Sequence, residues 1–338
     1  MNEGILSEPP DLAQALLSPD CYPGTPSDIK LVQTSTSYVF LTGDLAYKIK
    51  KPVDPGYLDY TTLEKRRFYC NREVSLNRRL CPDIYLDTVS ITDSKEGLSV
   101  EGKGKTLEYA VKMKQMPGGS MLGTLLDTDG ITSSVMHDIA RKLAEFHGKA
   151  ATSETISDYG DIEFILTGTE ENFIDSIRYI SKTISQKSYR AIKDYTNSFI
   201  ENNTELFYER ISDSKIRDCH GDLRVKHICV ADDIYIFDCI EFNDSLRYCD
   251  VASEVAFLAM DLDLYGRTDL SHKFVDAYLS ITGDEDLPEI LDFYKCYRAY
   301  YRGRIESMKL DIPNISEEQT AEITETAGKY FELAESYI

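Results

Sequence analysis

Short apolar runs with β-branched and aromatic residues, separated by polar turns, recur between residues 29 and 116, and this pattern is typical of β-strands. Gly43–Asp44 separates two of these runs as a plausible hairpin turn. Residues 61–80 interrupt the series, because their apolar residues recur at helical spacings behind a capping Thr61 or Thr62. The predicted strands are residues 29–34, 37–43, 45–53, 83–92 and 107–116.

Helical periodicity dominates the rest of the chain. Residues 133–149 place Val135, Ile139, Leu143 and Phe146 on one face, as expected for an amphipathic helix. One island of strand and loop, residues 216–243, interrupts the helical series. The further predicted helices are residues 171–186, 188–211, 250–264, 270–281, 287–309 and 316–336.

This order of elements predicts an α+β fold with two lobes, and 338 residues suffice for a core in each. Residues 29–117 form the small β-rich lobe, and residues 118–338 form the larger helical lobe. Residues 1–28 are expected to be an N-terminal extension that packs on the fold.

The net charge of the chain limits the kinds of partner that it is expected to bind. The 58 acidic and 37 basic residues give a net charge of -21, which repels nucleic acid and anionic membranes and serves solubility or a cationic substrate. The eight cysteines form no CxxC pair, and neither an export signal nor an apolar run of about 20 residues is visible. A cytoplasmic protein without a zinc ribbon is therefore expected.

The candidate catalytic residues lie in the strand-and-loop island, residues 216–243. Its sequence, CHGDLRVKHICVADDIYIFDCIEFND over residues 219–244, places Asp222 after a glycine and ends a short strand at Asp238. Phosphoryl transfer needs a carboxylate at the acceptor hydroxyl, a cation near the phosphoryl group and a second acid at a divalent metal. Asp222, Arg224 and Asp238 supply these three functions in that order.

The HGDL segment, His220 to Leu223, resembles the catalytic loop of the aminoglycoside phosphotransferase and choline kinase superfamily, which has the protein-kinase fold. The resemblance implies that His220 and Asp222 belong to the catalytic segment and that Asp238 binds Mg²⁺. His227 stands where the family has an asparagine. It is a poor Mg²⁺ ligand, a residue that favours Mn²⁺, or a hydrogen-bond partner of Asp222.

The resemblance extends to the nucleotide-binding lobe. Lys48 fits the A-x-K of the family strand and would bind the ATP phosphates. Lys50, on the same strand face, is the alternative for this role. Glu73 resembles the helix glutamate that holds this lysine, and Glu64 is the alternative. Further nucleotide contacts are expected in a glycine-free loop and in the hinge between the lobes, at Ser35, Thr36, Ser37, Gln115 and Met116.

From about residue 12 to 308 the sequence is also similar to a group of bacterial and archaeal phosphotransferase-like proteins, in segments such as LAYKIKKPV and DVASEVAFLAMDL. Some of these relatives append a P-loop ATPase domain, which is not expected here. The segment Gly104-Lys105-Thr106 is no Walker A motif, since Ser99 replaces the first glycine and a strand follows.

The acceptor is less well defined by the sequence. Arg298 and Arg302 form a basic stripe with Lys295 that could receive an anionic group of the acceptor, or could pair with Glu254, Asp261 or Asp263. Glu241 is a second candidate contact to acceptor or metal, and Asp250 is read as a buried carboxylate that braces a loop.

The sequence therefore predicts an ATP- and metal-dependent phosphotransferase that acts on a hydroxyl of an unidentified small molecule. A non-catalytic nucleotide-binding regulator is the alternative from another class. A protein kinase fits less well, because no A-P-E segment or long activation loop follows Asp238.

Overall fold

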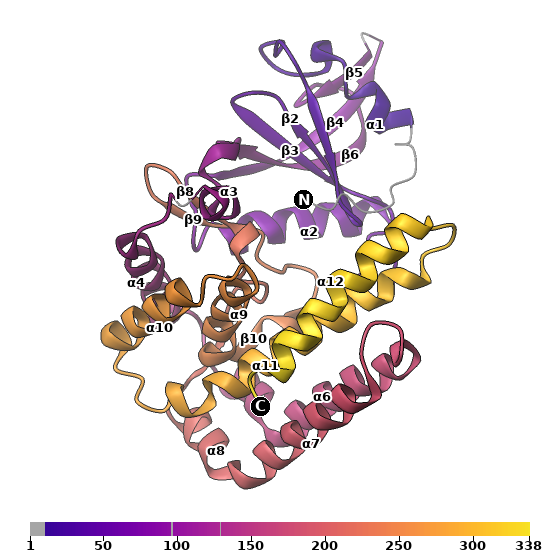
Figure 1. Cartoon of the computed structure of the whole chain (residues 1–338). Coiled ribbons are helices and arrows are strands. Elements are labelled where there is room, and N and C mark those ends of the chain that lie inside the picture. Colours follow the sequence, from indigo (N-terminus) through magenta and orange to yellow (C-terminus); the bar gives the residue numbers. More distant parts are fainter. Residues whose placement is uncertain (1–10, 96, 129) are drawn as a thin grey trace. The chain divides into compact units, whose positions relative to one another are not determined.

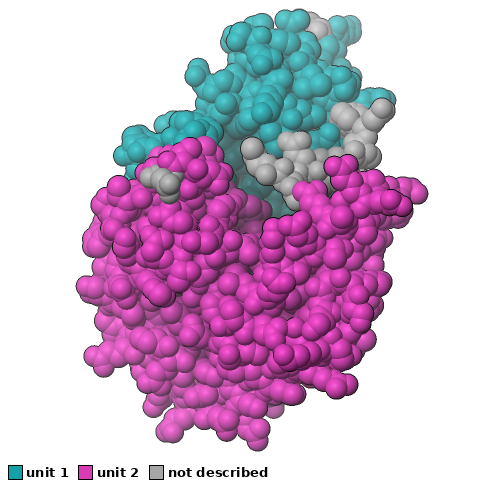
Figure 2. All heavy atoms as spheres, viewed as in Figure 1, with its two compact units in different colours: residues 1–121, 231–243 teal, residues 122–230, 244–338 magenta. Residues whose placement is uncertain are grey.

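The computed structural model of the chain describes residues 11–95, 97–128 and 130–338. The chain divides into two compact units, which Figure 2 shows in different colours. The first contains residues 1–121 and 231–243, and the second contains residues 122–230 and 244–338. Of the predicted N-terminal extension, residues 1–10 lie outside the described residues.

The first unit is built on a six-stranded antiparallel sheet with the order β1-β2-β3-β6-β4-β5 (Figure 1). The β2–β3 connection contains Gly43 with a φ of 99°, which confirms the predicted hairpin turn. The strands are β1 Lys30–Gln33, β2 Ser37–Leu41, β3 Leu45–Lys50, β4 Tyr85–Ser94, β5 Gly97–Val100 and β6 Lys105–Lys114, and β9 Ile234–Ile236 also belongs to this unit.

The two faces of the sheet are covered differently. Tyr47 of β3 packs into a cluster with Leu16 and Tyr22 of the segment that includes the short helix α1 (Asp11–Ala15). Ala46 points to the opposite face and packs against Cys70 of α2 (Leu63–Asn77). Because side chains alternate along a strand, Lys48 and Lys50 lie on the face that α2 covers.

The second unit is mainly helical (Figure 1). The 133–149 prediction is confirmed by α4, and α9 to α12 lie within about two residues of their predicted positions. The helices are α3 Leu122–Asp127, α4 Ser133–Lys149, α5 Glu154–Ser157, α6 Ile162–Ser176, α7 Gln186–Asn202, α8 Thr204–Ser212, α9 Val251–Leu264, α10 Thr268–Thr282, α11 Leu287–Met308 and α12 Glu317–Glu335, and the strands are β7 Ile216–Asp218, β8 Ile228–Val230 and β10 Tyr248–Asp250.

One predicted helix, residues 171–186, is wrong. Helix α6 ends at Ser176, and Ser181 takes a left-handed φ of 67° that no helix continues. The hydroxyl of Ser185 then accepts the backbone N–H of Ser188 and begins α7. The predicted helix 188–211 is likewise divided at Asn203 into two helices. In both cases the spacing of apolar residues did not reveal where the helix ends.

Helix α9 lies at the centre of the second unit, and 12 of its 14 residues are buried. Asp250 caps its start by accepting the backbone N–H of Ala252 at 2.8 Å. The guanidinium of Arg210 binds both oxygens of Asp250 and also reaches Asp284, and all three side chains are buried. Asp250 thus braces the chain where α9 begins.

No helix among the described residues is long and apolar enough to cross a membrane. All eight cysteines are free thiols.

Replacing Arg210 should unfold the second unit readily. Arg210→Met leaves the carboxylates of Asp250 and Asp284 buried without their shared cation, and we expect a loss of about 3–5 kcal/mol in the free energy of unfolding. Urea denaturation measures this loss. Lys329→Met, which removes a cation from an exposed pair with Glu325, is the control and should cost less than about 1 kcal/mol. Equal effects of the two substitutions would contradict the bracing role.

Candidate functional site

Lys48 of β3 is bound by two carboxylates within the first unit. Its Nζ lies 2.8 Å from Oε1 of Glu73 on α2 and 2.6 Å from Oδ1 of Asp238. Glu73 is fully buried, whereas the side chain of Asp238 is 39% exposed. A lysine, a helix glutamate and an exposed aspartate that is 190 residues from the lysine in sequence therefore meet at one point.

Lys50 lies in a closed environment beside this group. Its Nζ is 2.7 Å from Oε2 of Glu73, so the two lysines share that carboxylate. Glu241 and the hydroxyl of Tyr60 also contact the Lys50 ammonium, and Tyr60 donates to Glu241. Lys50 is 1% exposed, and Glu241 is occupied in holding it. Solvent-side ligands therefore have access to Lys48 rather than Lys50.

The charges of this cluster stabilise one another. Burial would lower the pKa of Lys48, but the attraction of Asp238 and Glu73 outweighs it and raises that pKa well above its ordinary value. Burial would raise the pKa of Glu73, but Lys48 and Lys50 keep it lowered. Both lysines and Glu73 are therefore ionised at neutral pH.

Helix α2 also positions the segment that carries Asp238. The side-chain oxygen of Asn77 accepts the backbone N–H of Cys239 at 2.9 Å, while its nitrogen donates to the carbonyl of Glu73. The backbone N–H of Asp238 donates to the hydroxyl of Tyr85 at 3.2 Å. Asp238 itself has a left-handed φ of 65°, a conformation that costs energy in a non-glycine residue and is fixed here by these contacts.

The predicted loop and hinge residues are also located in the first unit. The turn between β1 and β2 is closed by Thr34, whose hydroxyl oxygen accepts the N–H groups of Thr36 and Ser37. Ser35 is exposed, while Ser37 is buried in β2. Of the two predicted hinge residues, Gln115 accepts the N–H of Gly43, and Met116 packs against the cluster around α2. None of these contacts assigns a nucleotide role.

In the second unit, Asp222 and Arg224 form a two-pronged ion pair. Nε and Nη2 of Arg224 lie 2.8 and 2.9 Å from the two carboxylate oxygens of Asp222. Nδ1 of His227 is 2.7 Å from the backbone carbonyl of Asp222, which matches the hydrogen-bonding alternative for this histidine. Burial would raise the pKa of Asp222, but Arg224, His227 and Lys226 hold it well below its ordinary value.

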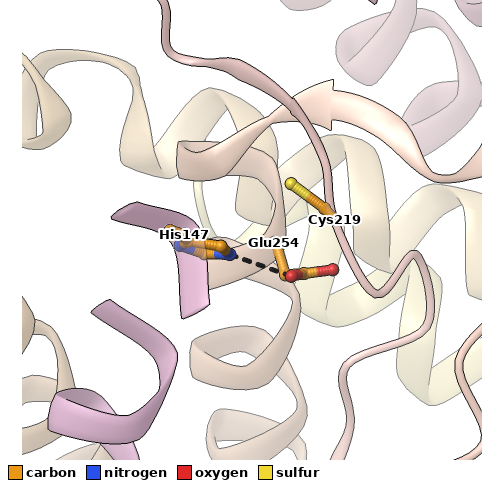
Figure 3. A group of neighbouring side chains, drawn as sticks. All are labelled: His147, Cys219 and Glu254. Atoms are coloured by element: carbon orange, nitrogen blue, oxygen red, sulfur yellow. Dashed lines mark hydrogen bonds and ion pairs between the residues drawn. The ribbon is translucent and has the colours of Figure 1, made fainter. Parts of the chain in front are cut away.

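The backbone before Asp222 is held by Glu254 of α9. Its carboxylate accepts the N–H groups of His220 and Gly221 at 2.8 and 2.7 Å. His147 of α4 lies 2.9 Å from the same carboxylate, as Figure 3 shows, and its other ring nitrogen lies 2.7 Å from the hydroxyl of Tyr278. Gly221 has a φ of 91°, so a glycine is needed at this turn.

The group His147, Cys219 and Glu254 has the residue types of a metal site but is already satisfied. Both nitrogens of His147 have partners, and Glu254 accepts two backbone N–H groups. Burial raises the pKa of the Cys219 thiol well above its ordinary value, so it is not the thiolate that a metal would need. The group is a buried hydrogen-bonded brace of the loop.

Helix α9 holds the loop at a second point, where Asp261 accepts the backbone N–H of Val225 at 2.8 Å. His220 is fully buried between these contacts, so the structure gives it the position of a loop support. Sequence reasoning did not identify Glu254, Asn77 or His147 in these roles. The i, i+4 spacing of Asp250 and Glu254 was the available signal, since it places both carboxylates on one side of α9.

The basic stripe on α11 does not act as one unit. Lys295 pairs with Asp263 at 2.6 Å, and Arg302 pairs with Glu306 on the same helix at 2.7 Å. Arg298 is 7% exposed and contacts the hydroxyl of Ser253 at 3.0 Å instead of a carboxylate. Ion pairing with α9 is therefore present at Lys295, whereas Arg298 has no carboxylate partner among the described residues.

Comparison with known proteins gives uncharacterised relatives in mycobacteria. An uncharacterised protein of Mycobacterium tuberculosis and one of Mycobacterium bovis are each 32% identical over 292 residues, which is 86% of this chain. The same alignment covers 57% of each relative, so the chain spans little more than half of their length. No family profile matches the chain.

Solved structures show the class of fold. A choline/ethanolamine kinase family protein of Mesorhizobium loti matches with a TM-score of 0.53 at 12% identity, over 96% of this chain and 99% of its own. A GDP complex of aminoglycoside 2'-phosphotransferase-IIIa gives 0.52 at 13% identity, over 91% and 93%. Amicoumacin kinase in complex with AMP-PNP and Ca²⁺ gives 0.51 at 12% identity, over 97% and 94%.

The chain therefore has a kinase-like α+β fold, with a β-rich unit and a helical unit, which confirms the predicted fold class. More particularly, it is the fold of the choline kinase and aminoglycoside phosphotransferase structures.

The loop-holding role of Glu254 predicts a pH-dependent cost of substitution. Burial would raise the pKa of Glu254, but the hydrogen bonds from His147 and Gly221 keep it lowered, so its ionised form stabilises the fold. Glu254→Gln should lose about 2 kcal/mol or more at pH 7. The stabilisation is present above the ordinary glutamate pKa and lost as the pH falls through the lowered one.

The difference in unfolding free energy between wild type and Glu254→Gln should therefore shrink at about pH 4 and below, as urea denaturation at several pH values measures. Glu285→Gln, on an exposed glutamate, is the matched control. A difference that stays constant with pH would show that the charge of Glu254 is not what holds the loop.

Proposed function

We propose that this protein is an ATP- and divalent-metal-dependent phosphotransferase that acts on a hydroxyl of a small molecule. One observation carries the proposal: Lys48 is bound at once by the buried Glu73 and the exposed Asp238. Phosphoryl transfer requires such a lysine for the nucleotide phosphates and such an aspartate for the metal.

The first unit would bind the nucleotide. Lys48 would contact the phosphates, and Glu73 would fix its position while Lys50 offsets the second oxygen of Glu73. A carboxylate that is 39% exposed suits Mg²⁺, which prefers oxygen ligands and keeps several waters. The metal would neutralise charge on the phosphates. We assign it to Asp238 and leave His227, which bonds to the Asp222 carbonyl, with a role in holding the loop.

The second unit would activate the acceptor. The acceptor oxygen attacks the γ-phosphorus as the bond to the β-γ bridging oxygen breaks, and Asp222 takes the hydroxyl proton. Arg224 orients the carboxylate of Asp222 through its two hydrogen bonds. The loop reaches this conformation because Glu254 and Asp261 bind its backbone N–H groups on both sides of Asp222.

We also propose membership of the aminoglycoside phosphotransferase and choline kinase superfamily, on the HGDL segment together with the fold. Two structures with this fold contain GDP or AMP-PNP with Ca²⁺, which supports a nucleotide and a divalent metal. The alternative is a nucleotide-binding regulator without turnover. The occupation of both Asp222 oxygens by Arg224 favours this alternative, and the next experiment separates the two.

Asp222→Asn should abolish turnover and spare nucleotide binding. The amide accepts no proton, so metal-dependent phosphorylation of a sugar and amino-alcohol library should fall by about 10²–10⁴-fold in kcat. The ATP dissociation constant, measured by calorimetry with Mg²⁺, should change less than about threefold, because Asp222 belongs to the other unit from Lys48. Undiminished turnover in this variant would refute the role of Asp222, and no turnover of any acceptor by the wild type would favour the regulator.

Lys48→Met should impair nucleotide binding or turnover, whereas Lys50→Met should mainly lower the stability of the fold. Lys48→Met should raise the ATP dissociation constant or lower kcat/KM by about tenfold or more, through loss of a phosphate contact. Lys50→Met leaves Glu241 and one oxygen of Glu73 buried without their cation, so we expect mainly a loss of about 3 kcal/mol in unfolding free energy. Nucleotide titration and urea denaturation of both variants measure this. Intact ATP binding together with an unchanged kcat/KM in Lys48→Met would contradict the assignment of Lys48 as the phosphate lysine.

A further inference from the structure

The second unit contains a small aromatic cavity beside the start of α9. It has a volume of about 90 Å³ and lies among α6, β10, α9 and α11. Tyr248, Tyr297 and Tyr301 are among its walls, with Cys249, Ser253 and Arg298 as further lining residues. A single cationic side chain therefore lies in a wall rich in aromatic rings.

Arg298 is a buried cation without a carboxylate partner among the described residues. Its Nε contacts Ser253 at 3.0 Å, and its Nη2 lies 3.9 Å from the sulfur of Cys249. Its guanidinium lies 4.7 Å from the ring centre of Phe257. No partner of its Nη1 occurs in the described part of the chain, and this nitrogen is not sealed from accessible space. Arg298 lines the cavity, so its Nη1 group could bind a ligand there.

The acidic side chain in the same wall does not neutralise this charge. Asp250 lines the cavity, but both of its oxygens are bound by Arg210, and one also accepts the N–H of Ala252. Burial would lower the pKa of Arg298, but Cys249 and, more weakly, Glu254 help to raise it. The Glu254 carboxylate, however, is bound by His147 and by the backbone N–H groups of His220 and Gly221. A buried charge is costly unless it is paired, so the cost indicates a partner from outside the chain.

We propose that this cavity binds the anionic head of a small molecule, a carboxylate or phosphate whose short planar or apolar stem lies against the tyrosine rings. The planar guanidinium is suited to two oxygens of such a head. A volume of about 90 Å³ is small, so the cavity suits a head with a short stem. This site goes beyond the proposed phosphotransferase activity and does not require it.

Calorimetric titration of the full chain without nucleotide tests the site directly. Crotonate, a planar four-carbon carboxylate, should bind with a dissociation constant in the millimolar range. Crotonamide has nearly the same shape without the charge and should bind at least about tenfold more weakly. Inorganic phosphate forms a separate arm, since tighter binding of phosphate than of crotonate identifies a phosphate head. No heat with either anion, or equal affinity for crotonate and crotonamide, overturns the proposal.

Arg298→Met separates a binding role from a structural one. Replacing an unpaired buried charge by an apolar side chain of similar length should leave the urea midpoint unchanged or raise it. The same substitution should weaken binding of the preferred anion by at least about tenfold. Arg304→Met, on the same helix and paired with Asp175 outside the cavity, changes the net charge equally and should leave anion binding within about twofold.

Unchanged anion binding in Arg298→Met contradicts the proposal. A lowered urea midpoint, or failure of this variant to fold, also contradicts it, because the arginine would then be paired within the protein. Both results leave the kinase assignment intact, since they involve neither Lys48 nor Asp222. Loss of turnover in Asp222→Asn, conversely, leaves anion binding in the cavity untouched.

Discussion

The structure depends on one constraint, that a buried carboxylate must be paired with a cation or with backbone N–H groups. Glu73 in the first unit and Glu254 in the second are both almost fully buried, and each meets this constraint in its own way. Glu73 binds two lysines, whereas Glu254 binds two backbone N–H groups and a histidine. Each thereby fixes the segment on which the proposed chemistry depends.

Helix α2 in the first unit and helix α9 in the second unit each hold a loop in place through their side chains. Helix α2 holds the strand lysines through Glu73 and the Asp238 segment through Asn77, one turn later. Helix α9 holds the Asp222 loop before and after the aspartate, through Glu254 and Asp261. Because these contacts reach backbone groups as well as side chains, they fix the loop conformation and not only the position of one residue. This explains how a short loop can keep a strained backbone conformation such as that of Asp238.

The sequence was sufficient to predict which residues lie together where their contacts are local. The period of two placed Lys48 and Lys50 on one strand face, and Asp222 and Arg224 are two residues apart. It was insufficient where long-range packing decides, because no local pattern indicates that Glu241, 191 residues from Lys50, closes the environment of that lysine. The helix predicted over residues 171–186 failed for a related reason, since a left-handed Ser181 and a capping Ser185 outweigh apolar spacing.

The charge balance around Lys48 connects the fold to the proposed metal. When ionised, Lys48, Lys50, Glu73, Glu241 and Asp238 carry two positive and three negative charges. Each lysine faces one further carboxylate and one oxygen of Glu73, so the excess negative charge is divided equally between the two lysines. The Lys50 side is buried, whereas the Asp238 side is exposed. Asp238 is the most exposed of the three carboxylates, and an exposed excess of negative charge attracts a divalent cation. With a cation on Asp238, Lys48 would keep only Glu73 as its protein partner and could turn to a phosphate oxygen. Burial of Lys50 and Glu241 thus leaves Asp238 as the most accessible carboxylate of the group, which is where the proposed metal–nucleotide complex would bind.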